Sequence, residues 1–234
     1  MIVDLSADLG EGSPREDEVW PLLTSANVAC GGHVGDEHSM REAARLARRH
    51  NVRLGAHPSY PDREHFGRRS LDVTPDALRA SLRAQLDALR AHADVQHVKP
   101  HGALYNDAHK NRALADVIVS VLDEHTALVA PDHSQMAAAA RAAGIRVIRE
   151  AFADRRYEPD GSLTPRSIAG STLTIDEAAA QAKMLVHEHA VIARDGSRVT
   201  LHFDTICVHA DSEGAVERLR SIRAVLALPS AAGS

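Results

Sequence analysis

The chain alternates short apolar segments with longer segments of helical spacing, and it does so about seven times over 234 residues. Repeated strand–helix units of this kind produce a mainly parallel sheet with its helices outside. Seven units fit a closed, distorted (β/α) barrel better than an open sheet, so we predict an α/β fold with a seven-stranded barrel. The predicted strands are residues 2–6, 26–30, 52–56, 96–100, 127–130, 145–150 and 199–208.

Several helical segments carry start signals. Thr74 and Pro75 fit the N-cap and the first position of a helix over 74–92. Thr174, followed three residues later by Glu177, is typical of a capping box and predicts a helix that runs to about residue 189. Further helices are predicted after Asp36, over 110–124 and before Gly144.

The length of the chain favours one domain, because a single α/β barrel commonly reaches this size and no linker interrupts the sequence. We predict one barrel domain over residues 1–228 and a disordered tail over 229–234. The segment 153–172 lacks periodicity and is rich in charged residues, Gly and Pro. It predicts a long loop over the barrel mouth.

Composition narrows the possible partners and the location. The net charge is −5 and the sequence pI is about 6.3, so no basic stripe is available for nucleic acid. The two cysteines, Cys30 and Cys207, are too few for a disulfide framework. The N-terminus lacks a signal-peptide pattern, and no run approaches the roughly 18 apolar residues of a membrane span. We therefore expect a soluble, cytoplasmic protein with no membrane partner.

Ionisable side chains gather where the predicted strands end, which is where parallel α/β folds place their active sites. Lys99 and His101 are two residues apart on one strand, so both point to the same face. If that face is the barrel interior, the ammonium group needs carboxylate partners, and Asp8, Glu11 and Glu150 are the candidates. Four strand ends also carry a histidine, namely His33, His57, His101 and His209.

Each of these residues also has a purely structural interpretation. A single histidine after a strand is more often a hydrogen-bonded structural residue than a catalytic one. The convergence of four histidines on one barrel mouth nevertheless favours a functional site. The sequence contains no GxxxxGK[ST] phosphate loop, no GxSxG elbow and no HExxH zinc motif, so any such site uses none of these arrangements.

Seven motifs together resemble one known family: DLSADLGEG, SANVACGGHVGD, GAHPSYPD, FGRRSL, VKPHGALYN, EAFADRRY and TICVHAD. From about residue 2 to residue 220 the chain resembles the LamB/YcsF family. The resemblance implies a distorted seven-stranded barrel, similar in shape to polysaccharide deacetylases. It also implies the activity of a 5-oxoprolinase A subunit, which is the ATP-dependent opening of 5-oxo-L-proline to L-glutamate together with two further subunits of the B and C types.

Hydrolysis of a lactam, an unactivated amide, needs a general base, a general acid and stabilisation of an oxyanion. Lys99 is expected to meet the developing negative charge or the substrate carboxylate, and its removal to abolish turnover with little loss of stability. The predicted catalytic residues are Asp8, Glu11, His57, Lys99 and His101. The predicted substrate-binding residues are Asn27, His33, Tyr105, Asn106, Glu150, Asp154, Arg155 and His209.

Two aspects of this interpretation stay open at the level of the sequence. The chain departs from the family pattern at Ser6, Gly32 and Ala210, of which Ser6 and Gly32 are expected to lie in the pocket, and the exact lactam is therefore not fixed. Because there is no phosphate loop, ATP is expected to be handled with the partner subunits.

Two alternative functions follow from the same residues. One is a metal-dependent deacetylase or amidohydrolase acting on a related lactam or amide, for which Asp8, His33 and His57 are suitable ligand types. Their lack of diagnostic spacing makes this signal weak, and whether a divalent metal binds is open. The other is a non-catalytic subunit that binds a small acid.

Overall fold

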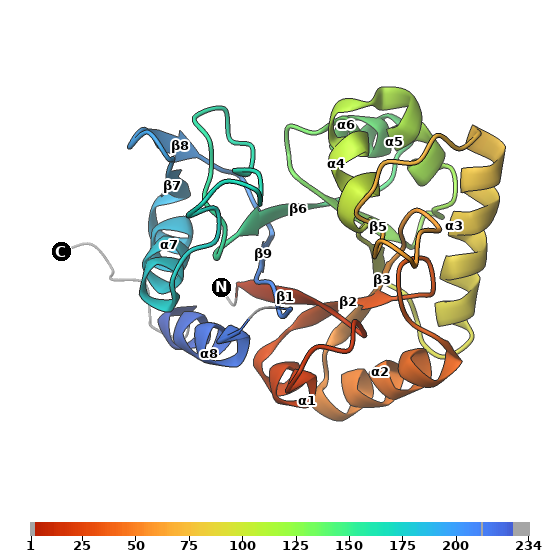
Figure 1. Cartoon of the computed structure of the whole chain (residues 1–234), viewed down its shortest axis with the longest axis horizontal. Helices are drawn as coiled ribbons and strands as arrows, with labels where there is room; N and C mark the ends of the chain where they lie inside the picture. Colours follow the sequence, from red (N-terminus) through yellow and green to blue (C-terminus); the bar gives the residue numbers. More distant parts are fainter. Residues whose placement is uncertain (1–2, 212, 227–234) are drawn as a thin grey trace.

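Seven parallel strands close into a barrel in the order β1-β2-β3-β4-β5-β6-β9, which confirms the predicted architecture (Figure 1). The computed structural model describes residues 3–211 and 213–226. The closure is made where β9 pairs with both β1 and β6. The strands are β1 Asp4–Leu9, β2 Ser25–Ala29, β3 Arg53–His57, β4 His97–Val98, β5 Ala127–Ala130, β6 Val147–Phe152 and β9 Thr205–Cys207.

Helices surround this barrel, and a small antiparallel hairpin stands beside it (Figure 1). Within the described residues, none of the helices is long and apolar enough to cross a membrane. The helices are α1 Glu16–Val19, the 3-10 helix η1 Trp20–Leu22, α2 Glu37–His50, α3 Pro75–Arg90, α4 Gly102–Lys110, α5 Arg112–Val119, α6 Gln135–Ala142, α7 Ile175–Glu188 and α8 Ala215–Leu226, and the hairpin strands are β7 Ala190–Ile192 and β8 Arg198–Thr200.

The predicted helix starts are confirmed by their capping hydrogen bonds. The Thr74 side chain accepts a hydrogen bond from the backbone N–H of Ala77, the third residue of α3, and Asp36 accepts one from the third residue of α2. Thr174 and Glu177 form the predicted capping box at the start of α7. Gly144 follows the end of α6 with a φ of 74°, the left-handed conformation that glycine adopts without strain.

Several predicted boundaries were wrong. The segment 199–208 is two strands, β8 and β9, which belong to different sheets and are separated by residues 201–204. The predicted strand 96–100 is reduced to β4, because Pro100 cannot donate a ladder hydrogen bond. The predicted helix 110–124 begins later as α5, whose N-cap is Asn111.

Two further predictions concern segments outside the regular elements. Residues 153–172 contain no helix and only isolated bridges, and this loop contributes to the wall of the mouth cavity. The predicted tail over 229–234 lies outside the described residues.

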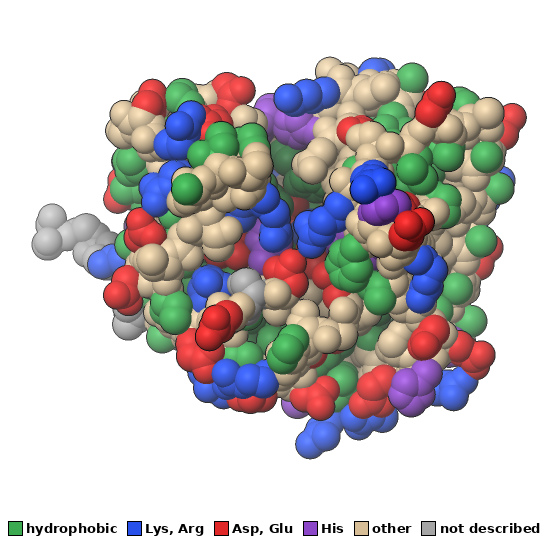
Figure 2. Space-filling view, viewed as in Figure 1, with side chains coloured by type: hydrophobic (Ala, Val, Ile, Leu, Met, Phe, Trp, Pro, Cys, Tyr) green, Lys and Arg blue, Asp and Glu red, His purple; other side chains and the backbone are tan. Residues whose placement is uncertain are grey.

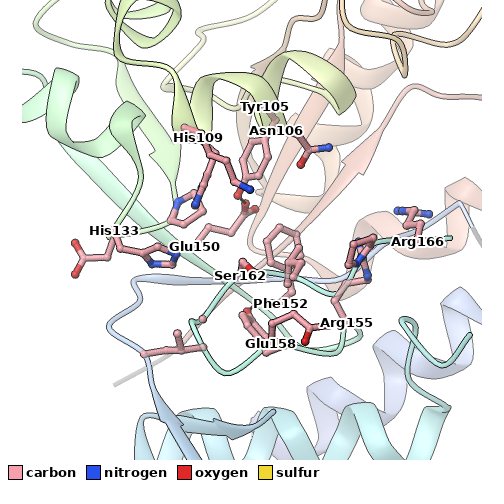
Figure 3. Close-up of a pocket in the computed structure, with 18 of the residues that line it drawn as sticks. Tyr105, Asn106, His109, His133, Glu150, Phe152, Arg155, Glu158, Ser162 and Arg166 are labelled. Atoms are coloured by element: carbon pink, nitrogen blue, oxygen red, sulfur yellow. Dashed lines mark hydrogen bonds between the residues drawn. The ribbon is translucent and has the colours of Figure 1, made fainter. Parts of the chain in front are cut away.

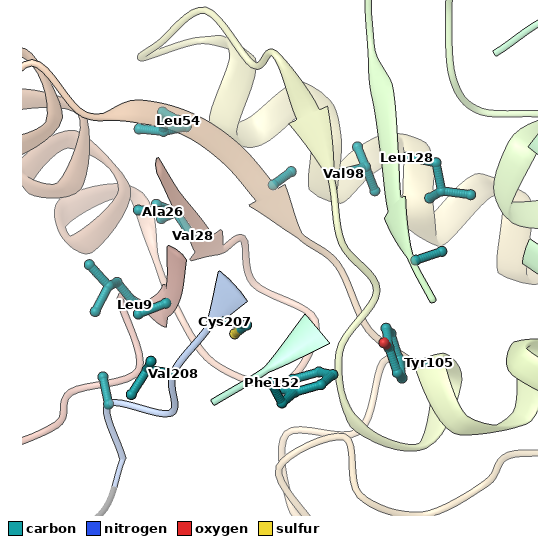
Figure 4. Close-up of a cluster of buried hydrophobic side chains, with 14 of the residues drawn as sticks. Leu9, Ala26, Val28, Leu54, Val98, Tyr105, Leu128, Phe152, Cys207 and Val208 are labelled. Atoms are coloured by element: carbon teal, nitrogen blue, oxygen red, sulfur yellow. The ribbon is translucent and has the colours of Figure 1, made fainter. Parts of the chain in front are cut away.

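The barrel interior is polar, and its sequence shows why. In β1 the residues alternate, so that Leu5, Ala7 and Leu9 pack into the apolar core between barrel and helices. Their neighbours Asp4 and Asp8 point to the inside of the barrel. Figure 4 shows the apolar side of this alternation on several strands, including Leu54, Val98 and Leu128. Barrel interiors ordinarily hold branched apolar residues, so polar groups here need hydrogen-bond partners.

A hydrogen-bonded chain supports the mouth of the barrel from below. Gly55 pairs in register with His97, and the imidazole fills the space that a side chain on residue 55 would occupy. His97 Nε2 lies 3.0 Å from Asn27 Oδ1, and Asn27 Nδ2 donates to Asp8 Oδ1 at 2.8 Å. The glycine therefore leaves room for the imidazole that orients the amide holding Asp8.

We predict that Gly55→Ala destabilises the protein by about 1–3 kcal/mol, because the added methyl group would overlap the His97 ring. In a His97→Ala background the same substitution should cost far less, since the space is then free. Urea denaturation of the four proteins of this cycle measures the coupling. Equal costs in both backgrounds would show that the imidazole does not set the requirement for glycine.

Candidate active site

The mouth of the barrel, at the carboxyl ends of its strands, is hollow. A cavity of about 930 Å³ lies between α4 and the loop 153–172 (Figure 3), and it adjoins a deeper cavity of about 90 Å³ at the strand ends. Tyr105, Phe152 and Arg155 line both. Figure 2 shows the hollow from outside, with Lys and Arg side chains gathered around it. A small molecule can therefore reach the strand ends from solvent.

An ion-pair network forms the deepest part of the site. Lys99 Nζ lies 2.8 Å from Glu150 Oε1 and donates to both oxygens of Asp8, at 3.1 and 3.2 Å. It also lies 3.1 Å from Cys207 Sγ, and Tyr105 donates a hydrogen bond to Glu150 Oε2 at 2.9 Å. The Lys99 ammonium thus contacts two carboxylates from β1 and β6, the two strands that flank β9 in the barrel.

Burial alone would lower the pKa of Lys99, but the charges of Asp8 and Glu150 raise that pKa well above its ordinary value. Burial opposes ionisation of Asp8 as well, yet the positive charges around it lower its pKa. The pKa of Glu150 is raised by burial, against the opposing effect of Lys99. At neutral pH the network therefore holds an ammonium group and an ionised Asp8.

Three histidines and a glutamate form a second cluster beside this network. Glu11 Oε1 lies 3.0 Å from His33 Nε2, 3.4 Å from His101 Nδ1 and 3.8 Å from His57 Nε2. The rings of His33 and His101 stack in parallel with centroids 3.7 Å apart. His57 Nε2 lies 3.4 Å from Asp8 Oδ2, so Asp8 connects this cluster to the Lys99 network.

Burial dominates the titration of this cluster. It raises the pKa of Glu11 to about 7, with repulsion by Asp8 adding to the effect. It lowers the pKa of His33 and of His101 to about 4, and that of His57 well below 6.5. The three imidazoles are consequently neutral at physiological pH and available as acceptors or ligands.

Arginine side chains border the upper part of the cavity. Arg155 is 6% exposed, and its guanidinium donates to two carbonyl oxygens, those of Thr164 and Ser171. Within the described part of the chain it has no carboxylate within ion-pair distance, in contrast to Arg68 and Arg166, which both lie near Asp211. Arg155 is thus a buried cation whose charge is directed at a cavity.

Ten of the predicted site residues line these cavities. Asn27, His33 and Asp154 do not, and each instead supports a residue that does. Asn27 donates to Asp8, His33 contacts Glu11, and Asp154 holds His209 through its backbone N–H and its Nδ1. The ten lining residues are Asp8, Glu11, His57, Lys99, His101, Tyr105, Asn106, Glu150, Arg155 and His209.

The expectation that Ser6 and Gly32 lie in the pocket was wrong. Ser6 lines a separate cavity of about 30 Å³ at the opposite end of the barrel. Gly32 packs against Ser59 and Gln85, which fill the space that a side chain would need. Of the three residues that differ from the family pattern, Ala210 is the one that lines the mouth cavity.

Some lining residues have only a weak signal in the sequence. Arg68 was not among the predicted site residues, yet it lines both cavities, as does Arg166 from the loop 153–172. Phe152 places its ring 5.2 Å from Lys99 Nζ. For Arg166, the sequence did contain a signal. The loop 153–172 was predicted to lie over the barrel mouth, so each Arg or Lys in it was a candidate for binding an anion.

Parallel β/α barrels with ionisable residues at the carboxyl ends of their strands are typically enzymes. The fold and the site described above have the features of this class of protein. The LamB/YcsF family model matches residues 3–231. Proteins named as the A subunit of 5-oxoprolinase, from Neisseria meningitidis serogroups A and B, are each 45% identical to this chain over 230 residues, covering 94% of both chains. The chain belongs to the LamB/YcsF family.

A solved structure gives the same answer for the fold. The lactam utilization protein from Thermus thermophilus superposes with a TM-score of 0.90 at 41% sequence identity. The superposition covers 97% of this chain and 96% of that one. The two proteins therefore share the same barrel fold over nearly the whole length of both chains.

Lys99→Met is predicted to destabilise the protein by about 3 kcal/mol or more, because Asp8 and Glu150 would be left buried without their shared cation. The expectation of little stability loss required the carboxylate partner of Lys99 to become protonated; because two carboxylates share this ammonium, we now expect a larger loss. Adding Glu150→Gln should recover part of the loss, since Tyr105 can still donate to the amide oxygen. Urea denaturation decides, and a single variant as stable as wild type would contradict the prediction.

We also predict that stability falls as the pH falls from 6.5 to 4. Burial lowers the pKa of His97 to about 4 from 6.5, so in this window the unfolded chain binds a proton that the folded chain does not. The loss from this residue at pH 4.5 should be about 2–3 kcal/mol. His97→Gln, which can still donate to Asn27, should lose less between pH 7 and 4.5 in urea denaturation. An equal loss in both proteins would assign the effect elsewhere.

Proposed function

We propose that this chain is the A subunit of a 5-oxoprolinase and that it opens the ring of 5-oxo-L-proline to give L-glutamate, with ATP and two further subunits of the B and C types. The observation that carries the proposal is a buried Arg155, without a carboxylate partner among the described residues, across one cavity from the Asp8–Lys99 network. The names of the relatives, the A subunit of a 5-oxoprolinase and a lactam utilization protein, support the same substrate class.

The substrate is a five-membered lactam that carries one carboxylate, and the cavity offers matching groups. Arg155 can bind the carboxylate with a charge-assisted hydrogen bond while it keeps its contacts to the loop. Phe152 offers an apolar face for the ring. The lactam carbonyl would then point toward the strand ends, where Lys99 supplies positive charge for the oxyanion.

Ring opening itself consumes one water and needs two proton movements. The coupled hydrolysis of ATP to ADP and phosphate, which is proposed for the partner subunits, consumes a second water. Water adds to the lactam carbonyl carbon, and a carboxylate of the Asp8–Glu11 pair accepts its proton. The C–N bond then breaks, and the same carboxyl group returns the proton to the leaving nitrogen. His57 and His101 border this position and hold the attacking water. Glu11 fits the proton transfer because burial raises its pKa to about 7, close to the working pH.

The partner subunits are proposed to bind the nucleotide and to complete the site. The sequence has no phosphate loop. The outer cavity, at about 930 Å³, is at the upper end of the volumes found for drug-sized ligands and is far larger than one lactam ring needs. Exclusion of water, which strengthens electrostatic stabilisation of the transition state, would therefore require a covering surface from another chain.

The test is to co-express this chain with the two candidate partner subunits and to measure glutamate and ADP release from 5-oxoproline. We expect turnover from the three-subunit complex and none from this chain alone. Robust turnover by the isolated chain would refute the partner requirement. Turnover of an N-acetyl sugar by this chain, with none of the lactam by the complex, would favour the deacetylase alternative. Binding of 5-oxoproline without turnover in any combination would favour the non-catalytic alternative.

Arg155→Gln is predicted to raise the KM of the complex for 5-oxoproline by about 10- to 100-fold with a smaller effect on kcat, because it removes a charge-assisted bond worth about 1.5–3 kcal/mol. Arg156→Gln is the matched control, since Arg156 is adjacent in sequence but pairs with Glu177 away from the cavity. Initial-rate kinetics with a thermal melt of each variant make the comparison. An unchanged KM in a folded Arg155 variant would remove this residue from the carboxylate site.

A further inference from the structure

The hydrogen bonds of His57 and His101 fix which of their ring nitrogens carry hydrogen. His57 Nδ1 lies 2.7 Å from the backbone oxygen of Lys99, and His101 Nε2 lies 2.9 Å from that of Phe66. A carbonyl oxygen only accepts, so both of these ring nitrogens are donors. In neutral imidazoles the two remaining nitrogens, His57 Nε2 and His101 Nδ1, therefore carry lone pairs.

These two lone-pair nitrogens face each other at 3.0 Å. Two acceptors at that distance repel unless something positive lies between or beside them. An added proton would place an imidazolium in a site where His57 is 1% and His101 5% exposed, and burial disfavours that charge. A bound metal cation satisfies both lone pairs at once.

One carboxylate oxygen lies close to both of these ring nitrogens and can serve as a third ligand. Glu11 Oε1 lies 3.4 Å from His101 Nδ1 and 3.8 Å from His57 Nε2. The three atoms thus form a triangle with edges of 3.0, 3.4 and 3.8 Å. Ligand atoms that bind tetrahedral Zn²⁺ at about 2.0–2.1 Å lie roughly 3.3 Å apart, so the triangle has the size of one face of such a site.

His33 is the other nearby candidate ligand, because its ligand atom lies within 4.8 Å of those of Glu11 and His101. Its ring, however, is parallel to that of His101 at a centroid distance of 3.7 Å and an interplanar angle of 4°. A metal in the plane of one ring would lie well outside the plane of the other, and ring-nitrogen lone pairs lie in the ring plane. The rings of His57 and His101, at 86° to each other, have no such conflict.

The residues behind the triangle also have the arrangement of a metal site. Metal-binding histidines ordinarily donate their other ring N–H to a backbone carbonyl or a carboxylate, which fixes the tautomer and the ring orientation. His57 and His101 both do this. His33 Nε2 contacts Glu11 Oε1 at 3.0 Å and can orient that carboxylate.

We infer that Glu11, His57 and His101 bind one divalent transition-metal ion of the Zn²⁺ type, with an open position facing the cavity. With Glu11 bound to the ion, the proton transfer proposed above for the Asp8–Glu11 pair would pass from Glu11 to Asp8, whose Oδ2 lies 3.4 Å from His57 Nε2. When bound, such an ion would polarise a carbonyl oxygen or acidify a water molecule. The inference rests on hydrogen-bond geometry and not on the proposed lactam activity.

The full-length chain should be stripped with a chelator, dialysed and titrated with Zn²⁺ by calorimetry, with metal content checked by elemental analysis. We expect about one ion per chain at micromolar or tighter affinity. His57→Gln and His101→Gln should each bind less than about 0.1 ion per chain under the same conditions. His209→Gln, in the same cavity but outside the cluster, is the matched control and should bind as wild type does.

His33→Gln separates the two possible ligand sets. If His33 only orients Glu11, this variant should keep one ion per chain with an affinity reduced about 10- to 100-fold at most. Loss of the ion in His33→Gln with retention in His57→Gln would overturn the assignment of His57.

Wild-type protein loaded with Co²⁺ provides a test that does not depend on the folding of any variant. Intense visible absorption bands, typical of four-coordinate Co²⁺, are expected. A stripped wild-type chain that binds neither Zn²⁺ nor Co²⁺ would overturn the site and assign the short contact between His57 and His101 to a shared proton.

Discussion

The burial of one carboxylate, that of Asp8, is the constraint on which the site depends. It accepts hydrogen bonds from Asn27 and Lys99 and lies beside His57, so it touches residues in β2 and β3 and the residue that directly follows β4. A carboxylate taken out of water needs such partners. Lys99 in turn forms a second ion pair with Glu150 of β6. Each polar group of the interior thus depends on the others for its hydrogen bonds and ion pairs. Because these groups are paired, they can occupy a barrel interior that ordinarily holds branched apolar side chains.

Much of the fold could be predicted because the local capping and turn residues agree with the strand–helix pattern of the whole chain. The capping box at Thr174, the N-cap at Thr74 and the seven strand–helix units each fix a local conformation that the barrel uses. The division of residues 199–208 was predicted wrongly because strand pairing between distant segments determines it. Nothing local distinguishes β8, which pairs with β7 outside the barrel, from β9, which closes it. The shortness of β4 follows from Pro100, a signal that is already present in the sequence.

The candidate site was predictable in its membership and less so in its roles. The closed barrel brings strand ends together, so Asp8, Lys99 and Glu150 had to converge once closure was assumed. Whether a residue lines the cavity or stands behind it depends on loop geometry, and His33 and Asp154 lie behind it for that reason. Arg155 could be placed on the covering loop, but its lack of a carboxylate partner among the described residues depends on the path of that loop.

The charges of the two clusters bear on the metal inference. Asp8 is ionised and Lys99 is charged, so these two nearly cancel, while Glu150 and Glu11 both have raised pKa values. The histidine cluster therefore has neutral imidazoles beside a carboxyl group that burial and Asp8 push toward protonation. A dication among Glu11, His57 and His101 would hold that carboxyl group ionised and would bind both facing lone pairs. One ion would thus remove both the repulsion between the facing lone pairs of His57 and His101 and the unfavourable burial of an ionised Glu11.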